Sequence, residues 1–110
     1  MKIINLDRGQ GKTTRLLYAS EFNNIPILCA TLQHKKFIEE SARQLGLKIP
    51  EPICVANLIH YSEMRDEKLL NKDILIDEAP MVLQILLNNM GMRGEVKAIT
   101  LTSDELKQGF

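Results

Sequence analysis

The residues best suited to chemistry form a short loop near the N-terminus, Arg8-Gly9-Gln10-Gly11-Lys12-Thr13-Thr14. The loop follows an apolar run and opens a segment with helical periodicity, which is where a phosphate-binding loop belongs. Glycine permits positive φ, so successive backbone N–H groups can point at phosphate oxygens, and the helix N-terminus adds partial positive charge. We expect this loop to bind the phosphates of a nucleotide.

Three side chains of the loop have distinct expected roles. Lys12 would reach the β and γ phosphates, Thr13 would offer its hydroxyl to Mg²⁺, and Thr14 would bond the α phosphate. The full pattern has a glycine five residues before Gly11, where this chain has Leu6. We therefore expect an altered entrance to the loop with the anion-binding amides intact. The alternative interpretation is a glycine turn and a capped helix with an exposed lysine.

Two adjacent carboxylates, Asp77 and Glu78, end the most apolar run of the chain, Ile74-Leu75-Ile76. In α/β sheets, ligands bind at the C-terminal ends of the strands. We expect Asp77 to hold the Mg²⁺ shell through water, and Glu78 to orient or deprotonate an attacking water. Taken alone, the pair is also typical of a helix start, where acids are favoured by the helix dipole.

The elements that must position these residues alternate between short β-rich runs and helical segments. Strands are predicted at 2–6, 26–30, 53–55, 74–76 and 96–101, and helices at 12–22, 33–45, after Asn57, at 80–90 and, short, after a Thr102–Glu105 capping box. Parallel strands need a crossover, usually a helix. We therefore expect a single α/β domain over residues 1–110, with a mostly parallel five-stranded sheet and helices on both faces.

Composition narrows the function classes. The chain has 110 residues, 45% of them hydrophobic, and its 14 basic and 14 acidic side chains cancel. This balance excludes the general cationic surface of a non-specific nucleic-acid binder, and the absence of tryptophan gives no platform for stacking bases. Cys29 and Cys54 lack metal-ligand spacing, so we expect buried free thiols in a soluble, cytoplasmic protein. His34, Lys35 and Lys36 are read as a solvated helix face, with contact to a few phosphates as the alternative.

Both motifs together resemble a known family. The loop Gly9–Thr13 and the run Ile74–Glu78 resemble the Walker A and Walker B motifs of P-loop NTPases, in the RecA-like branch that has a catalytic glutamate beside the magnesium aspartate. Arg8 resembles the loop of phage terminase motors, and Leu28–Thr31 leading into His34–Lys36 resembles a helicase segment that touches a nucleic-acid backbone. The run Ile99–Thr102 stands in the place of the polar sensor strand, which implies sensor roles for Thr100 and Thr102.

The resemblance implies a minimal, truncated P-loop domain that binds Mg²⁺ and ATP and hydrolyses ATP slowly. Lys12 and Glu78 would be the catalytic residues, and the context would be a phage or mobile-element nucleic-acid process. The missing arginine finger would come from a homo-oligomer or a larger protein partner. Arg43, Arg65 and Arg93 could serve a neighbouring subunit in this way, with an ordinary solvated surface arginine as the alternative interpretation of each. The alternative is a non-enzymatic P-loop module that binds and regulates a protein partner of a DNA machine.

Overall fold

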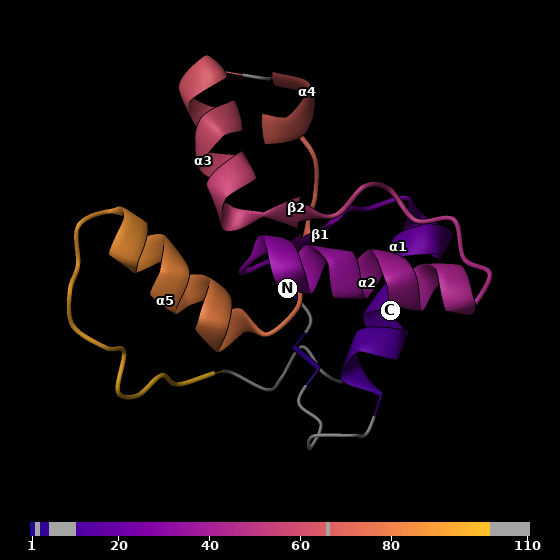
Figure 1. The fold of residues 1–110 in the computed structure, drawn as a ribbon, viewed down its shortest axis with the longest axis horizontal. Helices are drawn as coiled ribbons and strands as arrows, with labels where there is room; N and C mark the ends of the chain where they lie inside the picture. The colour runs from indigo at the N-terminus through magenta and orange to yellow at the C-terminus, as the bar shows by residue number, and fades with distance from the viewer. Residues whose placement is uncertain (2, 5–10, 66, 102–110) are drawn as a thin grey trace.

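The computed structural model describes residues 1, 3–4, 11–65 and 67–101 (Figure 1). Its elements follow in the order α1 (Lys12–Asn23), β1 (Ile27–Cys29), α2 (Leu32–Gln44), β2 (Ile53–Cys54), α3 (Val55–Met64), α4 (Glu67–Leu70), β3 (Leu75–Ile76) and α5 (Ala79–Asn89). Each strand is followed by a helix. The predicted α/β class is therefore confirmed.

The sheet of the described residues has three parallel strands in the order β2-β1-β3. The central strand, β1, pairs Cys29 with Cys54 on one side and Leu28 with Ile76 on the other. All three residues of β1 are buried. A continuous apolar run is the expected sequence of a strand covered on both faces, because neither set of alternating side chains meets water.

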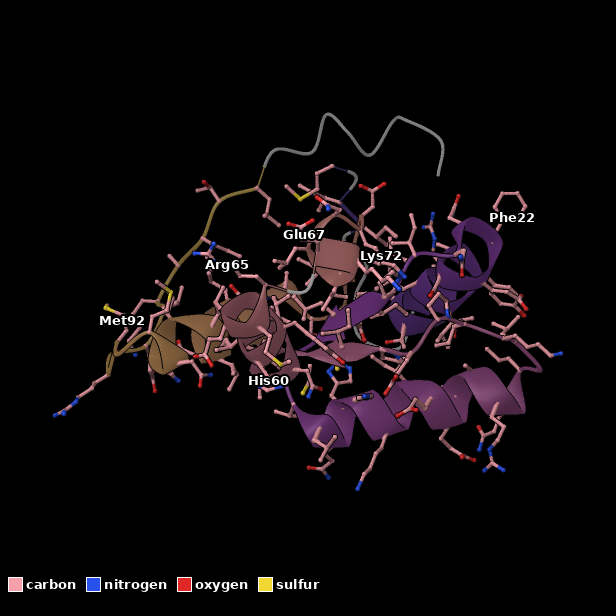
Figure 2. The ribbon with its side chains drawn as sticks, turned by 90° about the horizontal axis from the view of Figure 1, so that it is seen from above. Phe22, His60, Arg65, Glu67, Lys72 and Met92 are labelled. Carbon is pink, nitrogen blue, oxygen red and sulfur yellow. The ribbon has the colours of Figure 1, made fainter. Side chains whose placement is uncertain are left out.

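The core has two parts because successive side chains of β1 point to opposite faces of the sheet. Ile27 and Cys29 pack with Leu17 of α1 and Ile38 of α2. Leu28 lies in a second cluster, which contains Ala30, Ile53, Val55 and Val82. Seen from above, α2 runs along one side of the strands and α4, marked by Glu67, lies on the other (Figure 2). Helices on both faces are thus observed as predicted.

The prediction of five strands was wrong. The predicted last strand, Val96–Leu101, has no regular secondary structure. The side chains of Ile99 and Leu101 are 43% and 60% exposed. A run of β-formers makes a strand only where one face is buried and the backbone finds a partner, and here the amide of Val96 donates instead to the Gln84 side chain, at 2.6 Å. Of the predicted first strand, 2–6, only residues 3 and 4 are described, and they form no strand.

Helices α1 and α2 end at residue types that commonly terminate helices. Asn24 ends α1 in the left-handed region, and its N–H bonds to the last carbonyls of the helix. After α2, Gly46 has φ 72° and the Leu47 amide donates to the Ala42 carbonyl, which closes the helix in the manner of a glycine cap. The helix predicted after Asn57 begins earlier, at Val55. The predicted C-terminal helix, with Thr102 and Glu105, lies outside the described residues.

The principal extents of the molecule are 37, 31 and 25 Å. Phe22, near the end of α1, and Met92, just beyond α5, lie at opposite ends of the view in Figure 2.

None of the helices in the described part of the chain combines the length and apolar character that crossing a bilayer requires.

Candidate functional site

Asp77 is held in place by hydrogen bonds of both its backbone and its side chain. Its backbone N–H donates to the carbonyl of Leu28 at 3.1 Å, which holds the residue at the C-terminal end of β3, beside the central strand. Asp77 is only 3% exposed. A buried carboxylate is unfavourable unless it has partners, and here the partners come from the first turns of two helices.

Thr13, in the first turn of α1, is one of these partners. Its Oγ1 donates to Oδ2 of Asp77 at 3.2 Å. The helix is preceded by Gly11, which has φ 80°, a conformation that costs a glycine little and other residues more. Gly11 has no side chain that could accept from the first N–H groups of α1. Those groups lack partners within the helix, so the end of α1 that approaches Asp77 is suited to an anionic ligand.

His34 is the second partner of Asp77. Its Nε2 lies 2.9 Å from the same Oδ2 atom, and its backbone N–H is capped by the Thr31 hydroxyl at the start of α2. The sequence analysis placed His34 on a solvated face and missed this contact. The available signal was its position: α2 starts where β1 ends, and the C-terminal ends of parallel strands lie at one edge of the sheet.

Lys12 and Glu78 form a second, more exposed pair at the same place. Lys12 Nζ lies 3.7 Å from Glu78 Oε1, and their side chains are 33% and 41% exposed. Glu78 has φ 56°, an uncommon conformation for a residue other than glycine, asparagine or aspartate. This bend turns the chain from β3 into α5. As a result Asp77 is buried while its neighbour Glu78 reaches solvent beside the lysine.

The structure brings together four of the predicted site residues: Lys12, Thr13, Asp77 and Glu78. Thr14 lies exposed in the first turn of α1. Thr100 lies in the segment that forms no strand, and within the described residues it makes no hydrogen bond to this group. The sensor strand that was expected around it is therefore not present. Arg8, Gly9, Gln10 and Thr102 lie outside the described residues.

The donor set can be compared with what Mg²⁺ requires. Within the described ranges, no cluster of three or more histidine, cysteine or acidic side chains could hold a metal ion. Mg²⁺ needs no such cage, because it keeps several waters and takes one or two protein oxygens together with substrate phosphates. Thr13 Oγ1 and Asp77 Oδ2, which lie 3.2 Å apart, are two oxygens that would hold such an ion.

The buried thiol of Cys29 is protonated at neutral pH and so is not a nucleophile. Burial raises the pKa of Cys29 to about 11, and the neighbouring Cys54 acts in the same direction. Both cysteines are free and buried, as predicted. Since the thiolate is the reactive form, the chemistry of this site rests on Lys12, Thr13, His34 and the two carboxylates.

Searches against protein-family models, curated proteins and solved structures gave no match to this chain.

Proposed function

We propose that this site binds a nucleoside triphosphate, ATP or another, with Mg²⁺, and hydrolyses its terminal phosphate slowly. The observation that carries the proposal is the contact between the start of α1 and the end of β3. The start of α1 supplies Lys12 and the Thr13 hydroxyl, and the end of β3 supplies the carboxylates of Asp77 and Glu78. These groups contact one another although Thr13 and Asp77 are 64 residues apart in the sequence. This is the set of groups that phosphoryl transfer to water uses.

Lys12 is the phosphate-binding side chain in this proposal. Its ammonium group now lies 3.7 Å from Glu78, in a pair exposed enough to contribute little to stability. A phosphate oxygen can therefore replace the Glu78 carboxylate as its partner. That exchange frees Glu78 to accept a hydrogen bond from the attacking water and to orient it towards the γ phosphate.

Thr13 and Asp77 are the side chains that would hold Mg²⁺, Asp77 directly or through water. When bound, the ion neutralises charge on the phosphate oxygens. His34 would then act as a positioning residue, because its hydrogen bond fixes the orientation of the Asp77 carboxylate. Lys12 and the first N–H groups of α1 would stabilise the charge that develops on the γ phosphate.

Fast hydrolysis of a nucleoside triphosphate usually needs an arginine that contacts the transferring phosphate. This site lacks such an arginine among the described residues. No arginine contacts Lys12, Thr13, Asp77 or Glu78 in the described part of the chain. Arg43, one of the surface candidates, pairs with Glu40. An arginine supplied by a neighbouring molecule contributes on the order of a thousandfold or more in rate. We therefore infer a low rate for the isolated chain.

A phosphate-release assay over a range of protein concentrations, with and without DNA, tests the proposal. Wild type should release phosphate above background, and Glu78→Gln should retain nucleotide but stop release. A specific activity that rises with concentration would reveal arginines acting between subunits. Equal release by wild type and Glu78→Gln would remove Glu78 from the mechanism.

A binding role without catalysis is favoured by a different observation. The apolar helix predicted at 80–90 is not deeply buried: Val82 is the one buried residue of α5, and Met81, Met90 and Met92 are exposed. We infer from these exposed apolar side chains that a protein partner could cover part of α5. If wild type binds nucleotide but releases no phosphate under any of the conditions above, the better description is the alternative, a non-enzymatic module that binds and regulates a protein partner. Contact of the helix face at His34–Lys36 with a nucleic-acid backbone has less support, because Lys35 is already paired with Glu51.

A further inference from the structure

A second polar site lies at the opposite edge of the sheet from Asp77. It is a cavity of about 230 Å³ over β2. Its lining comes from the segments before β1 and β2, from α2, and from α3 to the start of β3, and it includes none of Lys12, Thr13, Asp77 and Glu78. Because β1 separates β2 from β3, and neighbouring strands are about 4.8 Å apart, the two sites are distinct.

Three lysines line this cavity, Lys35, Lys68 and Lys72. Lys35 is neutralised by Glu51, whose Oε1 lies 2.8 Å from Nζ. This hydrogen bond raises the pKa of Lys35 and lowers that of Glu51, so the carboxylate stays charged and occupied. Among the described residues, Lys68 and Lys72 have no carboxylate partner. The cavity therefore carries an uncompensated positive charge.

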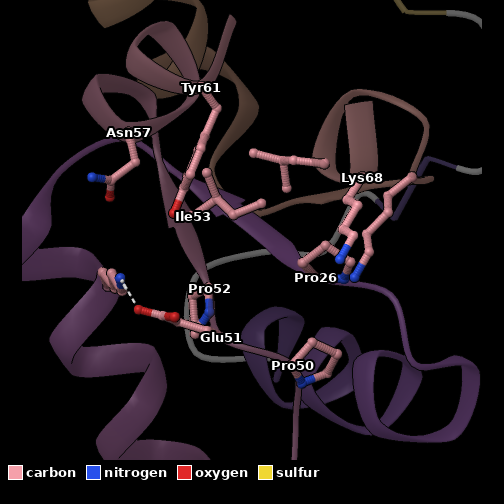
Figure 3. A pocket seen from close by; sticks show the side chains of 11 residues that line it. Pro26, Pro50, Glu51, Pro52, Ile53, Asn57, Tyr61 and Lys68 are labelled. Atoms are coloured by element: carbon pink, nitrogen blue, oxygen red, sulfur yellow. Dashed lines mark hydrogen bonds and ion pairs between the residues drawn. The ribbon is translucent and has the colours of Figure 1, made fainter. Parts of the chain in front are cut away.

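The cavity also offers neutral hydrogen-bond donors. Asn57 and Tyr61 extend from α3 on one side, while Lys68 of α4 extends towards Pro26 on the other (Figure 3). The Asn57 amide oxygen accepts from Cys54 Sγ at 3.0 Å, which leaves its NH₂ group as a donor. The Tyr61 hydroxyl makes no hydrogen bond within the described ranges. Three prolines, at 26, 50 and 52, form walls that contribute no N–H group and little flexibility.

We propose that this cavity binds a phosphate group carried by a small organic molecule or by a single-stranded nucleic acid. Two lysine ammonium groups with amide and hydroxyl donors match the charge and the oxygens of a phosphate. The volume corresponds to roughly eight waters, which suits a phosphate with a short organic chain and is smaller than most drug-sized pockets. The proposal does not depend on nucleotide binding at Lys12.

The test is a titration followed by the NMR shifts of backbone amides, at low salt. The probes are glycerol 3-phosphate, a monoester, and a short oligothymidylate, whose phosphates are diesters. We expect shifts in residues 52–72 to saturate with at least one probe. The probe that binds more tightly distinguishes a free phosphorylated molecule from a nucleic-acid strand.

Variants complete the test. Lys68→Gln and Lys72→Gln are exposed substitutions and should each weaken binding about tenfold, while Lys36→Gln, on the exposed surface of α2, should not change it. Far-UV circular dichroism of each variant checks that it is folded. The proposal is overturned if neither probe shifts residues 52–72, or if Lys68→Gln and Lys72→Gln bind as tightly as wild type.

Discussion

The hydroxyl of Thr13 lies 3.2 Å from the Oδ2 atom of Asp77, so the first turn of α1 is joined to the end of β3 across 64 residues of sequence. The contact places a small oxygen ligand beside a buried carboxylate. It also makes the two elements depend on each other, because Asp77 would lose one of its two side-chain partners if α1 moved away.

Replacing Thr13 with valine tests this link. Thr13→Val keeps the shape of the side chain but removes the donor, so we expect the free energy of unfolding to fall by about 1 kcal/mol. The difference in nucleotide affinity between Mg²⁺ and a chelator should become smaller, because Asp77 alone would then hold the ion. Denaturant unfolding and calorimetry measure the two effects. Thr13→Ser retains the hydroxyl and should retain both properties; if it behaves like Thr13→Val, the hydroxyl is not the important group.

The His34 contact predicts a change in metal dependence. Without the bond to Nε2, the Asp77 carboxylate is less firmly oriented, and we expect His34→Ala to need about tenfold more Mg²⁺ for half-maximal nucleotide binding. His60→Ala is the matched control, since His60 is an exposed histidine of α3. The same Mg²⁺ requirement in both variants would show that His34 does not position Asp77.

The left-handed backbone conformation of Glu78 predicts that replacing this residue with glycine raises stability and removes activity. Glycine adopts this conformation with less strain, so Glu78→Gly should raise the free energy of unfolding by about 1 kcal/mol. The same change should abolish phosphate release. Glu78→Ala also lacks the carboxylate but keeps the strain, and it should show no such gain. Equal stabilisation by alanine and glycine would mean that the gain comes from removing the charge.

Alkaline pH should weaken the fold through Cys29. Above about pH 9 the thiol ionises in the unfolded chain, while burial keeps it protonated in the folded chain until about pH 11. The folded state therefore binds more protons in this window, and its stability falls by up to about 1.4 kcal/mol per pH unit.

Denaturant unfolding at pH 8, 9 and 10 measures this slope. Cys29→Ala should reduce it, and Cys54→Ala should leave most of it in place. A slope unchanged in Cys29→Ala would place the alkaline sensitivity in other groups.

Local patterns in the sequence were enough to predict the parts of the site that lie next to strong structural signals. Gly11 before a helical run and Asp77 after an apolar run fixed the ends of α1 and β3, and the expected roles of Lys12 and Thr13 followed from their spacing. His34 was missed because nothing local distinguishes it from a surface histidine. Its contact depends on β1 lying beside β3, a pairing that local patterns do not specify.

The error in the sheet has the same origin. Val96–Leu101 has the residue types of a strand, but strand formation requires a partner and a buried face, and Ile99 and Leu101 remain exposed. In contrast, β1 is buried on both faces, and its three residues lie within the strand predicted at 26–30. Apolar composition therefore identified the central strand, but it could not say how many strands would pair with it.

Calorimetric titration of ATP with Mg²⁺ into wild type and Lys12→Ala tests the central claim most directly. Lys36→Ala serves as the control for loss of one positive charge, because Lys36 is exposed on α2, away from the described contacts of the site. We expect saturable binding of one nucleotide to wild type and to Lys36→Ala, and binding about a hundredfold weaker to Lys12→Ala. Equal affinity of Lys12→Ala and wild type, or no binding by wild type, would contradict the account.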